Sequence, residues 1–222
     1  MRYLISLALF AIVALSGALP ARAESATFFH LGPEVSTLGL GGEAGLRFND
    51  FFGLRVGGNY FDTNFDATLA GTEYDLGFVL ESAGAVIDVY PFGGGLRFSG
   101  GLRWNGNSID LSVTPANSIV IGGTTFTAAQ LGTLSGDVDF EDFAPFFGLG
   151  YEGDFFDQRV LLAFGAGVLF QGDPEVDLSA SGVLANDPAL LAALRREEND
   201  LEDDLDFLSF YPVVSLSLTF RF

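Results

Sequence analysis

Apolar and polar residues alternate along most of this chain with the two-residue period of β-strands. The last nine residues show the pattern most regularly, because every second residue from Val214 to Phe222 is apolar and the residues between are polar. Comparable alternation predicts strands over residues 36–48, 52–61, 74–90, 96–105, 137–151, 159–170 and 207–222. In the first of these it places Leu38 outward. In the third the apolar phase shifts near Glu81 and Ser82, which predicts a β-bulge.

The connections between these segments alternate in length. Short turns are expected at 49–50, 91–95 and 152–157, and longer connections at 62–73, 106–136 and 171–206. Outer-membrane barrels have short periplasmic turns and long external loops, so the chain is expected to cross a membrane as a meander. Because the strand over 36–48 ends in a short turn, an upward strand must precede it, and residues 25–31 are available. The count is then eight, and closure leaves no unpaired edge in lipid.

The predicted fold class is therefore all-β: an eight-stranded antiparallel transmembrane β-barrel, an up-and-down meander. One short helix is expected in the last external loop. Asp187 and Pro188 have the character of an N-cap and a first helical residue, and leucines then recur at helical spacings. Aromatic residues near the strand ends, such as Tyr60 and Trp104, are expected to form interfacial girdles.

The N-terminus has the pattern of a secretory signal. A basic start at Arg2 is followed by an apolar run over 4–19 and by the small-x-small triplet that ends at Ala23. We expect a cleaved signal peptide over 1–23 and one barrel domain over 24–222, with the cell outer membrane as the destination. Outer-membrane lipid and lipopolysaccharide are then the expected surroundings.

Composition excludes several classes of function. The formal net charge is −19, and all ten basic residues are arginine, so nucleic acid is not an expected partner. The chain has no cysteine, and therefore no disulfide or thiolate site. It has one histidine, His30, with no nucleophile that the sequence places beside it, so we expect no enzyme and no cofactor. Its 29 glycines and 24 phenylalanines suit a barrel with a crowded interior and a lipid-facing surface.

Charged residues fall into two groups in this topology. Candidates for the lumen wall are Glu43, Arg55, Glu81, Asp88, Arg97 and Arg103. Candidates for an acidic external mouth are Asp137, Asp139, Glu141, Asp173, Glu175, Asp177, Glu197, Glu198, Asp200, Glu202, Asp203, Asp204 and Asp206. A ring of carboxylates would concentrate cations at a narrow opening. They could equally be solvated loops, or bind divalent ions beside lipopolysaccharide; whether any of them binds a metal stays open. Inward glycines would leave room in the lumen, whereas the inward charges could pair and seal it.

Three stretches carry a family resemblance. They are residues 121–126 leading to 144–151, residues 170–178, and the acidic helix that runs into Tyr211-Pro-Val-Val214 and the last strand. The chain resembles the carbapenem-susceptibility-associated outer-membrane proteins, proposed channels for ornithine and basic amino acids, and related uncharacterised proteobacterial barrels. The resemblance implies that the barrel-insertion machinery reads the C-terminal strand ending at Phe222. It also implies a narrow passive channel for small cationic solutes such as basic amino acids. The alternative is a non-conducting structural or interaction barrel whose acidic loops bind divalent ions, lipopolysaccharide or a partner.

Overall fold

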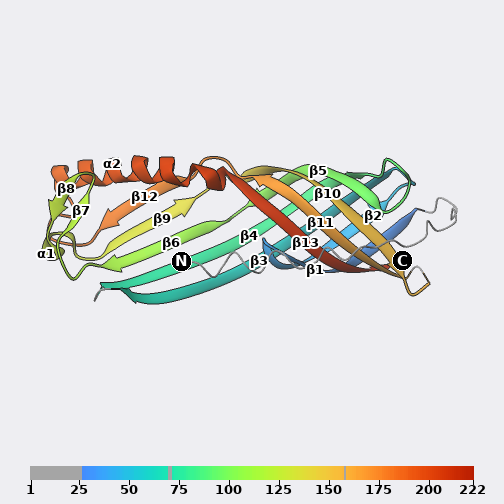
Figure 1. Ribbon diagram of the computed structural model, residues 1–222, viewed down its shortest axis with the longest axis horizontal. Coiled ribbons are helices and arrows are strands. Elements are labelled where there is room, and N and C mark those ends of the chain that lie inside the picture. The colour runs from blue at the N-terminus through green and yellow to red at the C-terminus, as the bar shows by residue number, and fades with distance from the viewer. Residues whose placement is uncertain (1–26, 70–71, 158) are drawn as a thin grey trace.

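Eight antiparallel strands close into a barrel, as the alternation predicts (Figure 1). The computed structural model describes residues 27–69, 72–157 and 159–222, so the expected signal peptide lies outside the described residues. The barrel strands are β1 (Phe28–Ser36), β2 (Gly39–Arg47), β3 (Phe52–Leu69), β4 (Thr72–Val89), β5 (Leu96–Asn105), β10 (Phe143–Phe155), β11 (Val160–Phe170) and β13 (Phe210–Arg221). Pairing of β1 with β13 completes the ring. The predicted fold class and strand number are confirmed.

The same sheet continues beyond the barrel on one side. β3 and β4 run on as a long hairpin, and three further strands extend their sheet in the order β3, β4, β6, β9, β12. The additional elements are β6 (Ser108–Thr114), β7 (Ile119–Ile121), β8 (Thr124–Phe126), α1 (Ala128–Leu131), β9 (Leu134–Asp139), β12 (Glu175–Ala180), α2 (Pro188–Leu205) and the 3-10 turn η1 (Asp206–Ser209). We call this part the external module, because it lies on the side of the long connections (Figure 1).

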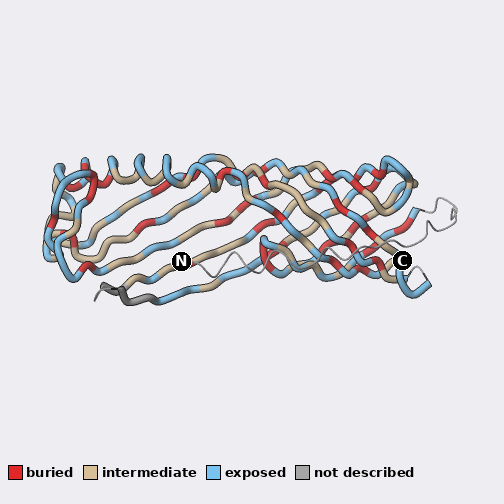
Figure 2. Tube along the Cα trace, viewed as in Figure 1, coloured by how far each residue is buried: buried red, intermediate tan, exposed pale blue. Residues whose placement is uncertain are grey.

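The outer wall of the barrel is apolar and exposed. Outward residues such as Leu54, Ile87, Leu102 and Phe164 leave large side chains uncovered; Phe164 is 48% exposed. Inward neighbours on the same strands are small or polar and are buried, so buried and exposed positions alternate along the barrel in Figure 2. This apolar-out, polar-in alternation is the arrangement of a barrel surrounded by lipid. No helix among the described residues is long and apolar enough to cross a membrane.

The boundaries of the first two strands differ from the prediction. The first strand is Phe28–Ser36 rather than 25–31, and the predicted strand over 36–48 begins with the tight turn that joins β1 to β2. Leu38 lies in that turn, where it is buried against Ala144 and Leu169 instead of facing lipid. The turn is closed by Gly39, whose φ of 112° is a conformation that side-chain-bearing residues rarely adopt.

The prediction of a long loop over 62–73 is wrong, and so is the prediction of a β-bulge near Glu81 and Ser82. β3 pairs with β4 in one unbroken register from Phe52–Val89 to Leu69–Thr72. The apolar residues therefore change from one face of the strand to the other near Glu81, while the pairing register of the backbone continues unchanged. The connections expected over 106–136 and 171–206 also contain strands, namely β6, β9 and β12. These strands are short, and a few irregular residues separate them from the barrel strands, so the sequence pattern does not reveal them.

The helix predicted in the last connection is confirmed as α2. The Asp187 side chain accepts a hydrogen bond from the amide of Ala189 at 2.8 Å, and Pro188 follows as the first helical residue. Leu190 and Leu194 pack into a buried apolar cluster with β7, β8 and α1. That cluster closes the end of the external module farthest from the barrel (Figure 1).

Candidate functional site

Ion pairs fill the half of the lumen that lies opposite the external module. Arg55 donates to both oxygens of Asp88, at 2.5 and 3.0 Å, and to Glu43 at 2.7 Å. Ser99 also donates to Asp88 at 2.5 Å, and Ser217 to Glu43 at 2.7 Å. Asp88 is fully buried. Buried carboxylates need such partners, because an unpaired charge in a low-dielectric interior is very costly.

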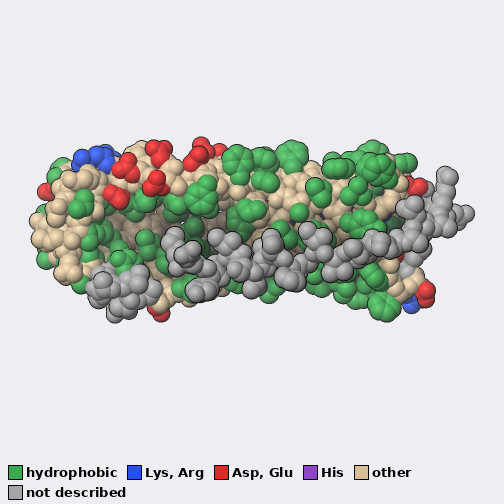
Figure 3. Space-filling view, viewed as in Figure 1, with side chains coloured by type: hydrophobic (Ala, Val, Ile, Leu, Met, Phe, Trp, Pro, Cys, Tyr) green, Lys and Arg blue, Asp and Glu red, His purple; other side chains and the backbone are tan. Residues whose placement is uncertain are grey.

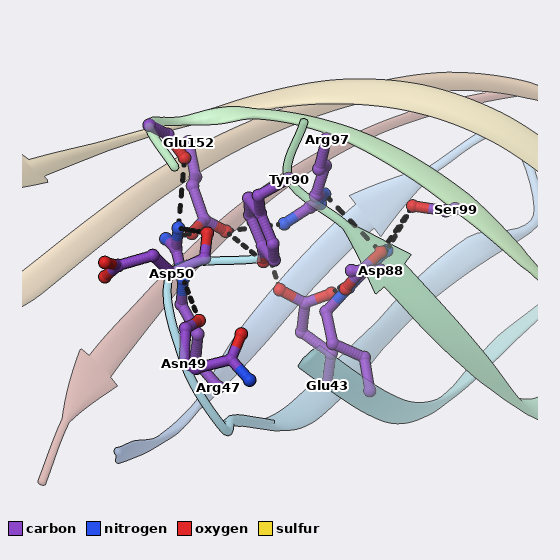
Figure 4. A network of polar contacts seen from close by, with 12 residues as sticks. Glu43, Arg47, Asn49, Asp50, Asp88, Tyr90, Arg97, Ser99 and Glu152 are labelled. Carbon is purple, nitrogen blue, oxygen red and sulfur yellow. Dashed lines mark hydrogen bonds and ion pairs between the residues drawn. The ribbon is translucent and has the colours of Figure 1, made fainter. Parts of the chain in front are cut away.

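A third carboxylate, Glu152, continues this network across the lumen (Figure 4). It accepts hydrogen bonds from Arg47 and Arg97, each at 2.9 Å, and from the Tyr90 hydroxyl at 3.2 Å. The guanidinium of Arg47 also lies over the Tyr90 ring, 3.8 Å from its centroid. Arg97 reaches back to Asp88 at 4.0 Å and so joins the two clusters. We call this connected set the lumen network: Glu43, Arg47, Arg55, Asp88, Tyr90, Arg97, Ser99, Glu152 and Ser217.

A smaller polar layer lies nearer the external module. Arg103 donates to Asn59 at 2.6 Å and to Ser82 at 2.9 Å, while the Asn59 amide donates to Glu34 at 2.9 Å. A cavity of about 40 Å³ lies between this layer and the lumen network, lined in part by Glu34, Arg55 and Arg103. That volume holds roughly a few water molecules.

Five of the six lumen candidates lie in the interior: Glu43, Arg55, Asp88, Arg97 and Arg103. The prediction that Glu81 faces the lumen is corrected, because Glu81 lies opposite the outward Tyr60 on β3 and is exposed. Its placement inside depended on the bulge that is not present. Glu152 was not singled out from the sequence, because its partners Arg47 and Arg97 are 105 and 55 residues away in the chain.

The predicted acidic residues of β9 and β12 lie on the outer face of the external module. Asp110, Asp137 and Asp177 stand directly opposite one another on three adjacent strands, and Asp139 stands opposite Glu175. The residues between them on β9 and β12 face the other way, toward the apolar cluster under α2. The prediction that the β9 and β12 carboxylates surround the barrel mouth is therefore corrected: they face outward.

Like charges directly opposite one another on adjacent strands repel. Partial burial, followed by hydrogen bonding and repulsion from Asp137, raises the pKa of the Asp110 carboxyl. A depression of about 360 Å³ lies on this face, bordered by Asp66, Asp75, Asp110 and Asp137. Among the described residues no group of three or more His, Asp or Glu side chains is arranged to hold a metal ion.

Three carboxylates of α2 have a structural task instead. Glu198 accepts a hydrogen bond from the backbone amide of Leu178 at 2.9 Å, and Glu202 one from Val176 at 3.2 Å. These two amides are on the edge of β12 that no strand covers in the described part of the chain. One helical turn apart, the two carboxylates match two amides of one strand edge. Glu197 similarly accepts from the amide of Gly122, at 2.7 Å.

The remaining predicted mouth residues are exposed: Glu141, Asp173, Asp200, Asp203, Asp204 and Asp206. Asp173 and Asp206 each accept a long hydrogen bond from Ser209, at 3.4 and 3.3 Å. This contact lies where α2 gives way to β13. These six carboxylates therefore lie at the surface of the module and of its junction with the barrel.

Buried amides join the barrel to the external module. Asn107 donates to Gln171 at 3.1 Å, Gln171 donates to the carbonyl of Leu208 at 3.0 Å, and Asn105 donates to the carbonyl of Glu141 at 3.3 Å. These contacts connect the end of β5 and the residues after it with the residues before β10, the residue after β11, and η1 before β13. The sequence offered one signal for them, namely amide side chains next to the strand interruptions.

No protein-family model and no curated protein matches the chain. Among solved structures, CarO2 of Acinetobacter baumannii aligns over 90% of this chain and 100% of its own, with a TM-score of 0.60 and 23% identity. CarO of the same organism aligns over 87% and 97%, with a TM-score of 0.59 and 24% identity. The resemblance drawn from the sequence is confirmed at the level of the fold. With its lipid-facing outer wall, the chain is an eight-stranded outer-membrane β-barrel that has the fold of CarO.

Proposed function

We propose that the protein is a closed outer-membrane barrel whose lumen does not conduct at rest and whose external module binds a ligand or partner. The observation that supports this is the lumen network, which runs without a gap from Arg47 through Glu152, Arg97 and Asp88 to Arg55 and Glu43. An eight-stranded barrel is just wide enough for side chains to fill it. The cavity of about 40 Å³ is too small for an amino acid.

A narrow channel for small cationic solutes, such as basic amino acids, is the second candidate. Two observations favour it: the formal net charge of −19, which attracts cations, and the glycines Gly148 and Gly165 beside the lumen cavity. This function requires the lumen network to rearrange before anything passes.

Recognition of β13 by the barrel-insertion machinery stays a prediction. An enzymatic role has little to support it. His30, the one histidine of the chain, is buried on β1 with its imidazole against Gly45. Its Nδ1 has no hydrogen-bond partner in the described part of the chain, and therefore no nucleophile that it could activate there.

Planar-bilayer conductance in a salt gradient separates the two candidates. We expect the wild-type barrel to show no steady single-channel current. The variant Glu43→Ala/Arg55→Ala/Asp88→Ala removes the centre of the network, opens space across the lumen and is expected to conduct. Arg159→Ala, at an exposed position in the turn before β11, is the matched control and should behave as wild type. A steady, cation-selective current through the wild-type barrel would overturn the closed-barrel proposal in favour of the channel.

A further inference from the structure

The external module turns an apolar face inward. On β4, Ser82 and Asp88 point into the barrel, and the unbroken alternation continues this inner face to Leu80, Phe78 and Leu76. Cross-strand pairing extends the same face over three neighbouring strands, where Phe61, Phe65, Ile109, Leu111 and Val138 belong to it. The rings of Phe65 and Phe78 are 6.2 Å apart in an edge-to-face contact, as residues of one face should be.

This inner face forms a groove that is open along one side. β2 pairs with β3 only as far as Leu40–Tyr60, so the later part of β3 is an edge of the sheet, and α2 forms the opposite border. Figure 3 shows a hollow with hydrophobic side chains on its walls below α2. Phe61 and Phe65 are 44% and 55% exposed in it. Exposed apolar patches of this kind on a protein surface generally mark a binding site.

The two ends and the side of the groove have different chemistry. The apolar cluster of β7, β8, α1 and α2 closes the far end. The polar layer that contains Arg103 and Asn59 lies toward the barrel. The open side lies above the short β1–β2 hairpin, whose outward Val35 and Leu40 belong to the lipid-facing wall. The groove is therefore continuous with the established lipid interface, and an apolar chain can enter it from that side.

The borders of the groove are acidic. In the stretches 61–80, 107–142 and 171–206 the sequence has two basic residues, Arg195 and Arg196, among many carboxylates. Asp62 and Asp66 lie on the outer face of the β3 border, and exposed Asp203 and Asp204 lie on α2. Such a field attracts a cation and repels an anionic headgroup.

We propose that the groove binds a single-chain cationic amphiphile, with its alkyl chain along the inner face and its cationic head at the acidic borders. Apolar walls gain from covering the chain, because burial removes both surfaces from water. The proposal names the ligand class of the external module and in that respect rests on the proposed function. Conductance tests the closed lumen separately, so each can fail without the other.

Isoleucine methyl NMR tests this directly on the full mature chain in zwitterionic lipid nanodiscs. Outside the expected signal peptide the chain has four isoleucines: Ile87, Ile109, Ile119 and Ile121. Ile109 lies in the groove, whereas Ile87 is 58% exposed on the lipid-facing wall and reports partition of the probe into lipid. The probes are decyltrimethylammonium and decyl sulfate, which share one alkyl chain. We expect the Ile109 methyl to shift in a saturable way, with affinity about tenfold tighter for the cation at low salt and a smaller ratio at high salt.

Matched variants on opposite faces of β6 complete the test. Leu111→Asn places an amide in the groove and should weaken binding of decyltrimethylammonium roughly tenfold. Ser112→Asn makes the same side chain on the outer face and should leave binding unchanged. Phe65→Ser, on the edge strand, is the second groove variant if Leu111→Asn does not fold. Equal or tighter binding of decyl sulfate, or shifts at Ile109 that merely follow those at Ile87, would overturn the proposal.

Discussion

Replacement of Arg55 by alanine should destabilise the barrel more than loss of any exposed charge. The guanidinium makes four hydrogen bonds, to Glu43, twice to Asp88 and to Ser99, at distances from 2.5 to 3.2 Å. The exposed fractions of the Glu43 and Asp88 side chains are 4% and 0%. Removal of one partner from a buried ion pair typically costs about 3–5 kcal/mol, because the other charge is left buried and unpaired. We expect a loss in that range for Arg55→Ala.

The measurement is urea unfolding of the barrel in phosphocholine bilayers, followed by the fluorescence of Trp104, the only tryptophan in the sequence. Arg159→Ala is again the control and should change the unfolding free energy by less than about 0.5 kcal/mol. The variant Glu43→Gln/Arg55→Met/Asp88→Asn removes all three charges together and should recover much of the loss, because no charge is then unpaired. A cost below about 1 kcal/mol for Arg55→Ala, or no recovery in the triple variant, would refute this account of the lumen.

Three further predictions test the lipid-facing wall and the external module. Glu198→Ala and Glu202→Ala should each speed hydrogen exchange at the β12 amide whose bond they remove, by roughly tenfold, while Asp203→Ala, which is exposed, should not. Asp110→Asn should stabilise the module above the pKa of this carboxyl. Because that pKa is raised in the folded state, the unfolding free energy of the wild type should fall as pH increases from the unfolded to the folded pKa of Asp110. Urea unfolding over a pH series should show this fall in the wild type and not in Asp110→Asn. Phe164→Arg should lower the unfolding free energy by about 2–4 kcal/mol in the same bilayer assay, because it puts a charge into lipid. An unchanged urea midpoint would mean that the outer side of β11 does not contact the bilayer.

The sequence predicted the barrel well because lipid imposes one simple rule on every strand. Each strand must be apolar on one face, and closure requires an even count in a meander of this kind. The start of α2 was equally readable, since Asp187 and Pro188 act locally. The predicted strand boundaries failed where tertiary packing decides them, as at Leu38, which lies in the β1–β2 turn and packs against Ala144 and Leu169.

The candidate site could be predicted only in part. Strand alternation assigned Glu43, Arg55 and Asp88 to the interior, but it could not show which charges meet. Glu152 pairs with Arg47, which lies 105 residues earlier in the sequence, and it is the closure of the barrel that brings these two side chains together. The sequence groups the carboxylates of α2 as one acidic set, although Glu198 accepts from the edge of β12, a strand inside the connection predicted over 171–206. Short strands such as β12, with six residues, give too little alternation to be recognised alone.

The phase shift at Glu81 shows how the surroundings of a strand determine its pattern. Below it, the outward residues of β4, such as Ile87, are apolar because they face lipid. Above it, the outward residues, such as Asp75, are polar because they face water, and the apolar residues now lie on the inner face with Phe78. β3 changes in the same way between Tyr60, which is outward, and Phe61, which is inward. Because the register is continuous, the reversal marks the height at which both strands leave the membrane, and an apparent bulge in an outer-membrane sequence can be such a boundary.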